Sequence, residues 1–107
     1  MKTNLPKFML KNWSVEERPR EKLISQGPQH LSNSELLALL IGIGNQGEKA
    51  IQLMHRLVVS LDNDLIKLHR ISIEKLLLWK GIGPAKAVKI KAALELGKRI
   101  QDFQLKK

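Results

Sequence analysis

The residues best suited to chemistry lie in segment 80–86, which reads Lys-Gly-Ile-Gly-Pro-Ala-Lys. Two glycines separated by one apolar residue permit a tight turn, because glycine has no Cβ atom to clash with the backbone. Pro84 suits the first position of a helix, where its missing N–H would have had no intrahelical acceptor. The turn therefore leaves backbone N–H groups unpaired where the next helix begins, at the positive end of the helix dipole. A phosphate oxygen is the natural ligand of such a site.

Lysines flank this turn, and the motif is typical of a helix-hairpin-helix, a module that binds the DNA backbone. Lys86 and Lys89 lie one turn apart at the start of the expected helix, where we expect them to contact phosphates. We expect Ile82 to point into the core and fix the hairpin. No Arg, Asn or Gln projects from a recognition helix there, so binding should not depend on base sequence. The predicted DNA-binding residues are Lys80, Gly81, Ile82, Gly83, Ala85, Lys86 and Lys89.

Positive charge is concentrated around the same hairpin. The 107 residues carry a net charge of +9, from 19 Lys and Arg and 10 Asp and Glu. Residues 70–107 contain ten of the basic residues and three of the acidic ones, so they hold +7 of that charge. A basic field of this kind attracts polyanions such as nucleic acids. Lys106 and Lys107, by contrast, are better explained as a solvated tail.

Composition excludes several other classes of function. The chain has no cysteine, so it forms no disulfide and uses no thiolate in catalysis or metal binding. It has no apolar run of about 18 residues and no signal peptide, which predicts a cytoplasmic protein without membrane contact. His30, His55 and His69 are isolated and match no metal-binding spacing. The chain is also too short for a base-flipping glycosylase pocket. We therefore expect neither catalysis nor a resident cofactor.

The apolar residues follow a helical period throughout, which predicts an all-α fold. Ser32 and Glu35 form a capping-box pattern at the start of the second helix. The expected helices are Pro19 to a stop at Gly27, Ser32 to Gly42, Glu48 to about Leu61, a short one around 65–68 capped by Asp62–Asp64, Ser72 to Lys80, and Pro84 to about Ile100. We expect an N-terminal arm over 1–18, anchored by Trp13 and then Phe8, a helical domain over 19–101, and a basic tail over 102–107.

A repeat within the chain suggests a second hairpin. Gly42-Ile43-Gly44 precedes Gly81-Ile82-Gly83 by 39 residues, and both follow a capped apolar helix. The pattern predicts tandem helix-hairpin-helix motifs joined by a short connector helix. Two hairpins on successive phosphates strengthen a weak contact by raising the local concentration. The first hairpin has only Lys49 nearby, beside Glu48, and its role is as readily structural.

Several of these segments together resemble the N-terminal region of the bacterial RadC family. They are 13–23, which contains Glu17-Arg18-Pro19-Arg20-Glu21-Lys22, and 31–38, 80–87 and 93–97. The resemblance implies a role linked to DNA repair and a phosphate-binding hairpin at Gly81, Gly83 and Lys86. It allows a monovalent cation at the hairpin carbonyls. Family members continue into a JAB/MPN metalloprotease-like domain whose His-x-His-Pro motif is missing here, so we expect a fragment or a natural short form.

Two interpretations of function remain open at this point. The leading one is a sequence-independent DNA-binding module that places the absent C-terminal domain, or a protein partner, on duplex or branched DNA. The alternative is a protein–protein interaction scaffold, in which the Leu-rich helices and Trp79 build the framework and the hairpin only connects them. Arg18 and Arg20 likewise could clamp phosphate or pair with Glu16, Glu17 or Glu21, and their near-cancelling charges favour pairing.

Overall fold

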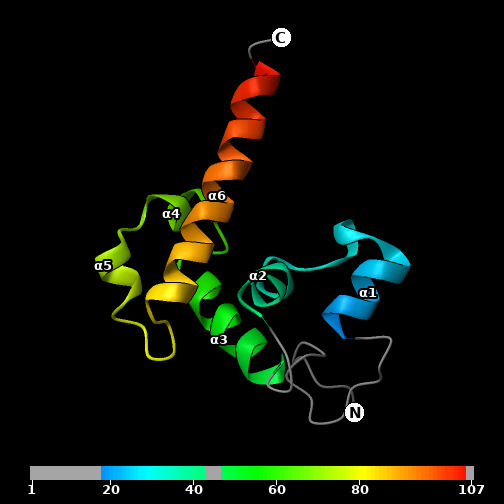
Figure 1. The fold of residues 1–107 in the computed structure, drawn as a ribbon, viewed down its shortest axis with the longest axis horizontal. Coiled ribbons are helices and arrows are strands. Elements are labelled where there is room, and N and C mark those ends of the chain that lie inside the picture. Colours follow the sequence, from blue (N-terminus) through cyan, green and yellow to red (C-terminus); the bar gives the residue numbers. More distant parts are fainter. Residues whose placement is uncertain (1–17, 43–46, 106–107) are drawn as a thin grey trace. The chain divides into compact units, whose positions relative to one another are not determined.

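The computed structural model describes residues 18–42 and 47–105, and all regular secondary structure in these ranges is helical (Figure 1). The elements are α1 (Pro19–Gln26), the 3-10 turn η3 (Pro28–His30), α2 (Asn33–Ile41), α3 (Gly47–Ser60), α4 (Leu65–Arg70), α5 (Ile73–Leu76) and α6 (Pro84–Leu105). The expected all-α class is confirmed. The chain divides into two units, residues 1–57 and 58–107. The predicted arm and tail boundaries remain predictions.

In the first unit, local signals at the helix ends determine where α1 and α2 begin. Pro19 occupies the first turn of α1, and Gly27 ends the helix with a φ of 93°. The predicted capping box of α2 is present: the Glu35 N–H donates to Ser32 Oγ at 3.1 Å, and the Ser32 N–H donates to Glu35 Oε1 at 2.9 Å. These bonds satisfy two backbone donors that a helix start would otherwise leave unpaired.

Glu35 also joins α1 to α2. The Lys22 ammonium lies 3.3 Å from Glu35 Oε1, and Glu35 is only 6% exposed. A buried carboxylate is tolerated when it is both paired and hydrogen-bonded, as here. The predicted structural role of the arginine block is seen in one weak pair, between Arg20 and Glu21 at 3.6 Å, while Glu16 and Glu17 lie outside the described residues.

The helices α2 and α3 each bury one apolar face. In α2 the buried hydrophobic residues are Leu37, Ala38 and Ile41, but Leu36 and Leu40 are 37% and 38% exposed, so this helix is less enclosed than its apolar sequence predicts. In α3 the inward residues expected from the sequence are all buried: Ile51, Met54, Leu57 and Val58. The helical period of apolar residues therefore predicts which residues are buried better in α3 than in α2, because α2 is apolar on nearly every side.

In the second unit, α4 and α5 pack against the first half of α6 (Figure 1). Asp64 caps α4 by accepting hydrogen bonds from the N–H groups of Ile66 and Lys67 at 2.9 and 3.4 Å. Ser72 caps α5 in the same way through the Lys75 N–H. The core of this unit contains Leu68, Leu76, Ile82, Ala87 and Ile90, each at most 4% exposed.

Two helix ends differ from the sequence prediction. The helix capped by Ser72 ends at Leu76 and not at Lys80, because the chain tightens into turns in which the Leu78 and Trp79 N–H groups bond to carbonyls three residues back. The last helix continues to Leu105, beyond the expected end near Ile100. Ion pairs four residues apart support this extension, between Lys98 and Asp102 at 2.9 Å and between Arg99 and Glu95 at 3.1 Å.

Candidate nucleic-acid interface

The hairpin between α5 and α6 is fixed from inside by Ile82. Its side chain is 4% exposed, as expected for a residue that points into the core. Its N–H donates to the Trp79 carbonyl at 3.0 Å, which closes the turn. Gly81 has a φ of 98°, a conformation that residues with a Cβ atom rarely adopt. The backbone therefore requires glycine at position 81.

The Lys86 side chain also holds this hairpin. Its Nζ donates to the Gly81 carbonyl oxygen at 3.0 Å, five residues back along the chain. Gly81 O and Ile82 N belong to one peptide unit, so both polar groups of this unit are hydrogen-bonded within the protein. That peptide unit is thereby held in one orientation and offers no unpaired N–H to a ligand.

Gly83 differs from Gly81 in its backbone conformation. It has no positive φ, and a Cβ atom built on it meets nothing within 4 Å. Its carbonyl accepts the Ala87 N–H at 3.0 Å, the first hydrogen bond of α6. Neither backbone strain nor internal packing therefore excludes a side chain at position 83. The position is exposed.

The unpaired donors of the hairpin lie in the first turn of α6. The N–H groups of Ala85 and Lys86 have no intrahelical acceptor, because the first turn of a helix has no carbonyl before it. Gly83, at the position where other helices carry a capping side chain, has none to offer them. Ala85 is exposed, and Pro84 contributes no N–H. The backbone therefore presents donors, together with the positive end of a 22-residue helix, to solvent.

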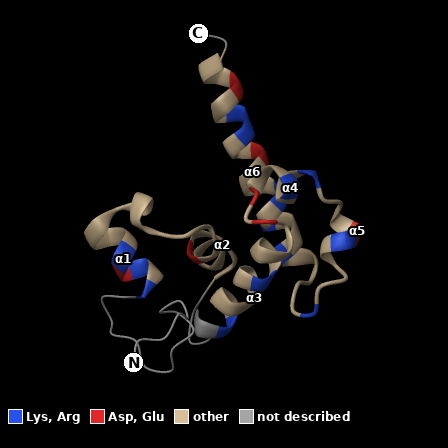
Figure 2. Cartoon of the chain, turned by 180° about the vertical axis from the view of Figure 1, so that it is seen from behind, with Lys and Arg blue, Asp and Glu red and all other residues tan. Residues whose placement is uncertain are grey.

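Lys80 and Lys89 flank these donors, and both are exposed. In residues 18–42 and 47–105, no carboxylate lies within ion-pair distance of Lys80, Lys86 or Lys89. In Figure 2 the loop between α5 and α6 accordingly carries basic but no acidic segments. A local field of uncompensated positive charge therefore surrounds the α6 N-terminus.

Three other basic residues of the second unit are bound to carboxylates. The hydrogen bond to Asp62, 2.6 Å long, raises the pKa of Lys67, and the bond to Asp102 raises the pKa of Lys98. Arg99 pairs with Glu95, which also lies 3.0 Å from Nε2 of His69. Two of the three acidic residues in 70–107, Asp102 and Glu95, thus pair with Lys98 and Arg99 and not with the hairpin lysines, so the net +7 falls on the other basic residues.

Lys91 has a structural role that the sequence did not reveal. Its Nζ donates to the carbonyls of His69 and Ile71, the latter at 2.6 Å, where α4 ends. An ammonium there satisfies carbonyls that have no intrahelical donor and complements the negative end of the helix. One sequence signal could have indicated this contact. Lys91 lies one turn beyond Ala87, on the edge of the face of α6 that packs on α4.

The structure also bears on the other predicted sites. A monovalent cation on the hairpin carbonyls does not fit at Gly81 O, because the Lys86 ammonium already lies on that oxygen. The first hairpin begins at Gly42, with a φ of 91°, but residues 43–46 lie outside the described part.

Within the described residues there is no cluster of three or more His, Cys, Asp or Glu side chains placed to bind a metal ion. Nor does any described helix combine the length and apolarity needed to cross a membrane.

Comparison with known proteins identifies related sequences. The family model described as UPF0758 N-terminal matches residues 10–88. A UPF0758 protein of Flavobacterium johnsoniae is 49% identical over 92 residues, which are 86% of this chain and 40% of that protein. A UPF0758 protein of Coprothermobacter proteolyticus is 48% identical over 93 residues, 87% of this chain and 39% of that protein. The chain thus spans about 40% of the length of these relatives. No solved structure matches it.

Proposed function

The chain belongs to the UPF0758 (RadC) family, and on that premise we propose that it is a DNA-binding module that recognises the phosphate backbone without reading base sequence. The names of its relatives state no ligand, so the proposal depends on the hairpin between α5 and α6. This module would hold the rest of a longer protein on duplex or branched DNA, in keeping with a role in DNA repair.

The N–H groups in the first turn of α6, which have no intrahelical acceptor, carry the proposal. At Gly83, just before them, the φ is not positive and a Cβ would meet no other atom within 4 Å, so nothing of the protein fills the space beside these donors. The backbone of a nucleic acid can approach them closely there. The adjoining N–H groups of the first turn of α6 are donors suited to phosphate oxygens. A phosphate bound there would lie against the position that a Cβ on residue 83 occupies.

The surrounding lysines supply attraction that is independent of sequence. Exposed lysines that neutralise phosphates release counterions, so the affinity should fall steeply as the salt concentration rises. No described side chain at the hairpin has the paired donor and acceptor groups of Asn or Gln that distinguish base edges in the major groove. The geometry therefore supports contacts that position a protein on DNA and does not support base recognition.

Fluorescence anisotropy with labelled duplex and forked DNA, over a series of salt concentrations, tests this proposal. The decisive variant is Gly83→Ala, which adds one methyl group at the proposed contact. Its control is Gly97→Ala, the same change at an exposed position of α6 where a Cβ also meets nothing within 4 Å. We expect Gly83→Ala to weaken binding about tenfold or more, which corresponds to about 1.4 kcal/mol. Gly97→Ala should bind like wild type.

Equal binding by the two variants, or no binding by the wild type, would reject the hairpin as a DNA site. Circular dichroism must show that both variants keep their helices. Gly83→Ala is expected to change stability little, since the loss of freedom in the unfolded chain and the poorer helix cap roughly offset each other.

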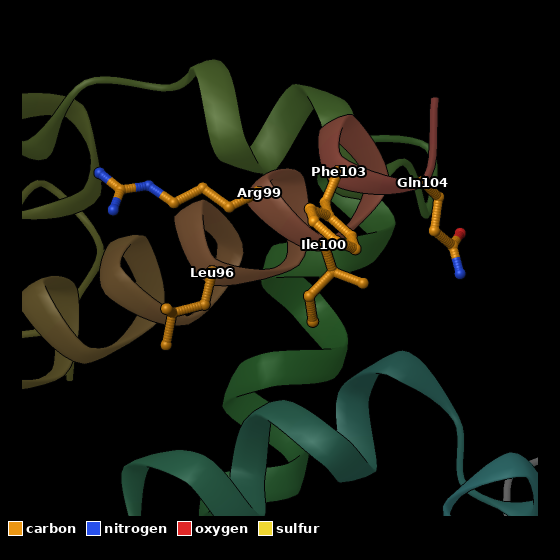
Figure 3. A pocket seen from close by; sticks show the side chains of 5 residues that line it. All are labelled: Leu96, Arg99, Ile100, Phe103 and Gln104. Atoms are coloured by element: carbon orange, nitrogen blue, oxygen red, sulfur yellow. The ribbon is translucent and has the colours of Figure 1, made fainter. Parts of the chain in front are cut away.

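One observation favours the second candidate, a protein-interaction scaffold. The last turns of α6 carry the hydrophobic side chains of Leu96, Ile100 and Phe103, which are 63%, 64% and 62% exposed (Figure 3). With Arg99 and Gln104 they line a shallow pocket. An exposed apolar patch of this kind is typical of protein contacts. Charge reversal at Lys86 and Lys89 separates the two functions, because it should abolish DNA binding and leave an interaction through this patch unchanged.

A further inference from the structure

The Lys86 side chain returns to its own hairpin and does not extend into solvent. Its Nζ lies 3.0 Å from the Gly81 carbonyl oxygen, and the residue is partly buried, whereas Lys80 and Lys89 are exposed. Both flanking lysines lack such a bond to the hairpin backbone. Three lysines that look equivalent in the sequence therefore have two different environments.

The hydrogen bond from Lys86 helps to hold the peptide unit between Gly81 and Ile82 in one orientation. The N–H of Ile82 is held by the Trp79 carbonyl, and the carbonyl of Gly81 is held by Lys86. A peptide plane anchored at both its donor and its acceptor cannot rotate about the adjoining bonds without breaking a hydrogen bond. The next peptide unit along the chain carries the N–H of Gly83, so its direction depends on this anchoring.

We propose that Lys86 is a positioning residue that directs the N–H of Gly83, just before the free donors of α6, at a phosphate, and that Lys80 and Lys89 are the side chains that contact phosphates. This inference rests on the proposed DNA-binding function and deepens it. It reverses the expectation from the sequence, in which Lys86 and Lys89 had the same role. The hydrogen-bonding partner of the Lys86 ammonium is the protein itself, so on this proposal it neutralises no phosphate.

The two roles have different consequences for salt dependence. Removing a lysine that contacts a phosphate lowers the magnitude of the slope of log affinity against log salt concentration by about one. Removing a positioning residue lowers the affinity by a similar factor at every salt concentration, because the same phosphates are still neutralised. A measurement at one salt concentration cannot separate these effects, but the slope can.

The test compares Lys86→Met with Lys89→Met, which is the same substitution one turn further along α6. Amide ¹H–¹⁵N spectra without DNA give the first readout. We expect Lys86→Met to shift the signals of Gly81, Ile82 and Gly83, and Lys89→Met to leave them in place. Anisotropy over a salt series gives the second. We expect Lys86→Met to bind more weakly with an unchanged slope, and Lys89→Met to reduce the slope by about one.

Each adverse outcome contradicts a different statement. Unchanged hairpin signals in Lys86→Met, or a slope reduced as in Lys89→Met, would overturn the positioning role. Failure of the wild type to bind DNA would reject the proposed function, while the amide spectra would still show whether Lys86 holds the hairpin. Core signals, such as those of Leu68 and Ile90, verify that each variant is folded.

Discussion

At the scale of single residues, the two glycines of one short motif have separate causes. Gly81 is required by its φ of 98°, whereas Gly83 has no positive φ and a Cβ on it would meet no atom within 4 Å. A Gly-x-Gly pattern alone does not distinguish a residue needed for the turn from one needed for the ligand. The backbone conformation shows that the turn needs the first glycine, whereas on the proposed function the second leaves room for the ligand.

This difference predicts opposite phenotypes for two alanine substitutions. Gly81→Ala should lower the free energy of unfolding by about 1–2 kcal/mol, because it forces a Cβ into a left-handed conformation. Gly83→Ala should change it by less than about 1 kcal/mol. Urea denaturation followed by circular dichroism measures both. Similar losses of stability in the two variants would show that the glycines are not distinguished in this way.

Glu95 makes stability depend on acidity. Its hydrogen bond with His69, and then that with Arg99, holds the pKa of its carboxyl below the ordinary value of 4.5. A carboxyl with a lowered pKa in the folded state stabilises the fold above its ordinary pKa, and that contribution is lost as the pH falls through the lowered value. Wild type should therefore lose stability below about pH 4.5 more steeply than Glu95→Gln, in which the group cannot titrate.

Urea midpoints at pH 7, 5, 4 and 3 measure this difference. The two proteins should differ at pH 7 and approach one another at pH 3. Parallel curves over the whole range would mean that titration of the Glu95 carboxyl does not contribute to the pH dependence of stability.

At the scale of elements, the sequence predicted the helix N-caps and the helical period of the apolar residues, but it did not predict the tertiary contacts. Ser32, Asp64 and Ser72 cap helices as expected, since each cap depends only on residues two or three positions away. The early end of α5 was missed, because the apolar pattern 76–79 continues a helical period while the chain already turns toward the hairpin. The bond from Lys91 to the carbonyls of His69 and Ile71 spans at least 20 residues, and no local pattern encodes it.

The Lys91 contact predicts a stability effect on the junction between α4 and α6. Lys91→Met removes two bonds from an ammonium to backbone carbonyls and should cost about 1.5–3 kcal/mol of unfolding free energy. Lys89→Met, an exposed position on the same helix, should change it by less than about 0.5 kcal/mol. Chemical denaturation of the two variants provides the comparison. A loss no larger in Lys91→Met than in Lys89→Met would show that these bonds do not stabilise the fold.

At the scale of the whole molecule, the net charge does not show which cations are available to a polyanion. The chain carries +9, but Lys67, Lys98 and Arg99 are paired with carboxylates and Lys91 is bound to carbonyls. The sequence placed the basic field around the hairpin correctly, yet it could not show which cations were already engaged. That distinction depends on side-chain partners that only the folded chain brings together.

The engaged and available cations should differ in their effect on salt dependence. Replacing both Lys80 and Lys89 by Met should reduce the slope of DNA affinity against salt concentration by about 1.8, at about 0.9 per phosphate contact. Replacing both Lys67 and Lys98 by Met removes the same formal charge but should leave the slope nearly unchanged. Equal reductions by the two double variants would indicate that binding follows total charge and not the geometry of the hairpin.

The continuity of α6 has a mechanical consequence. A single helix of 22 residues begins at the proposed phosphate contact and, at 1.5 Å per residue, ends about 33 Å away at Leu105. Two ion pairs reinforce its far half, and the helix contains no proline after Pro84 at its first position. A rigid helix of this length would keep anything joined to its far end at a fixed distance from the nucleic-acid backbone. A small tilt of the hairpin would be amplified along the helix into a large displacement at that end.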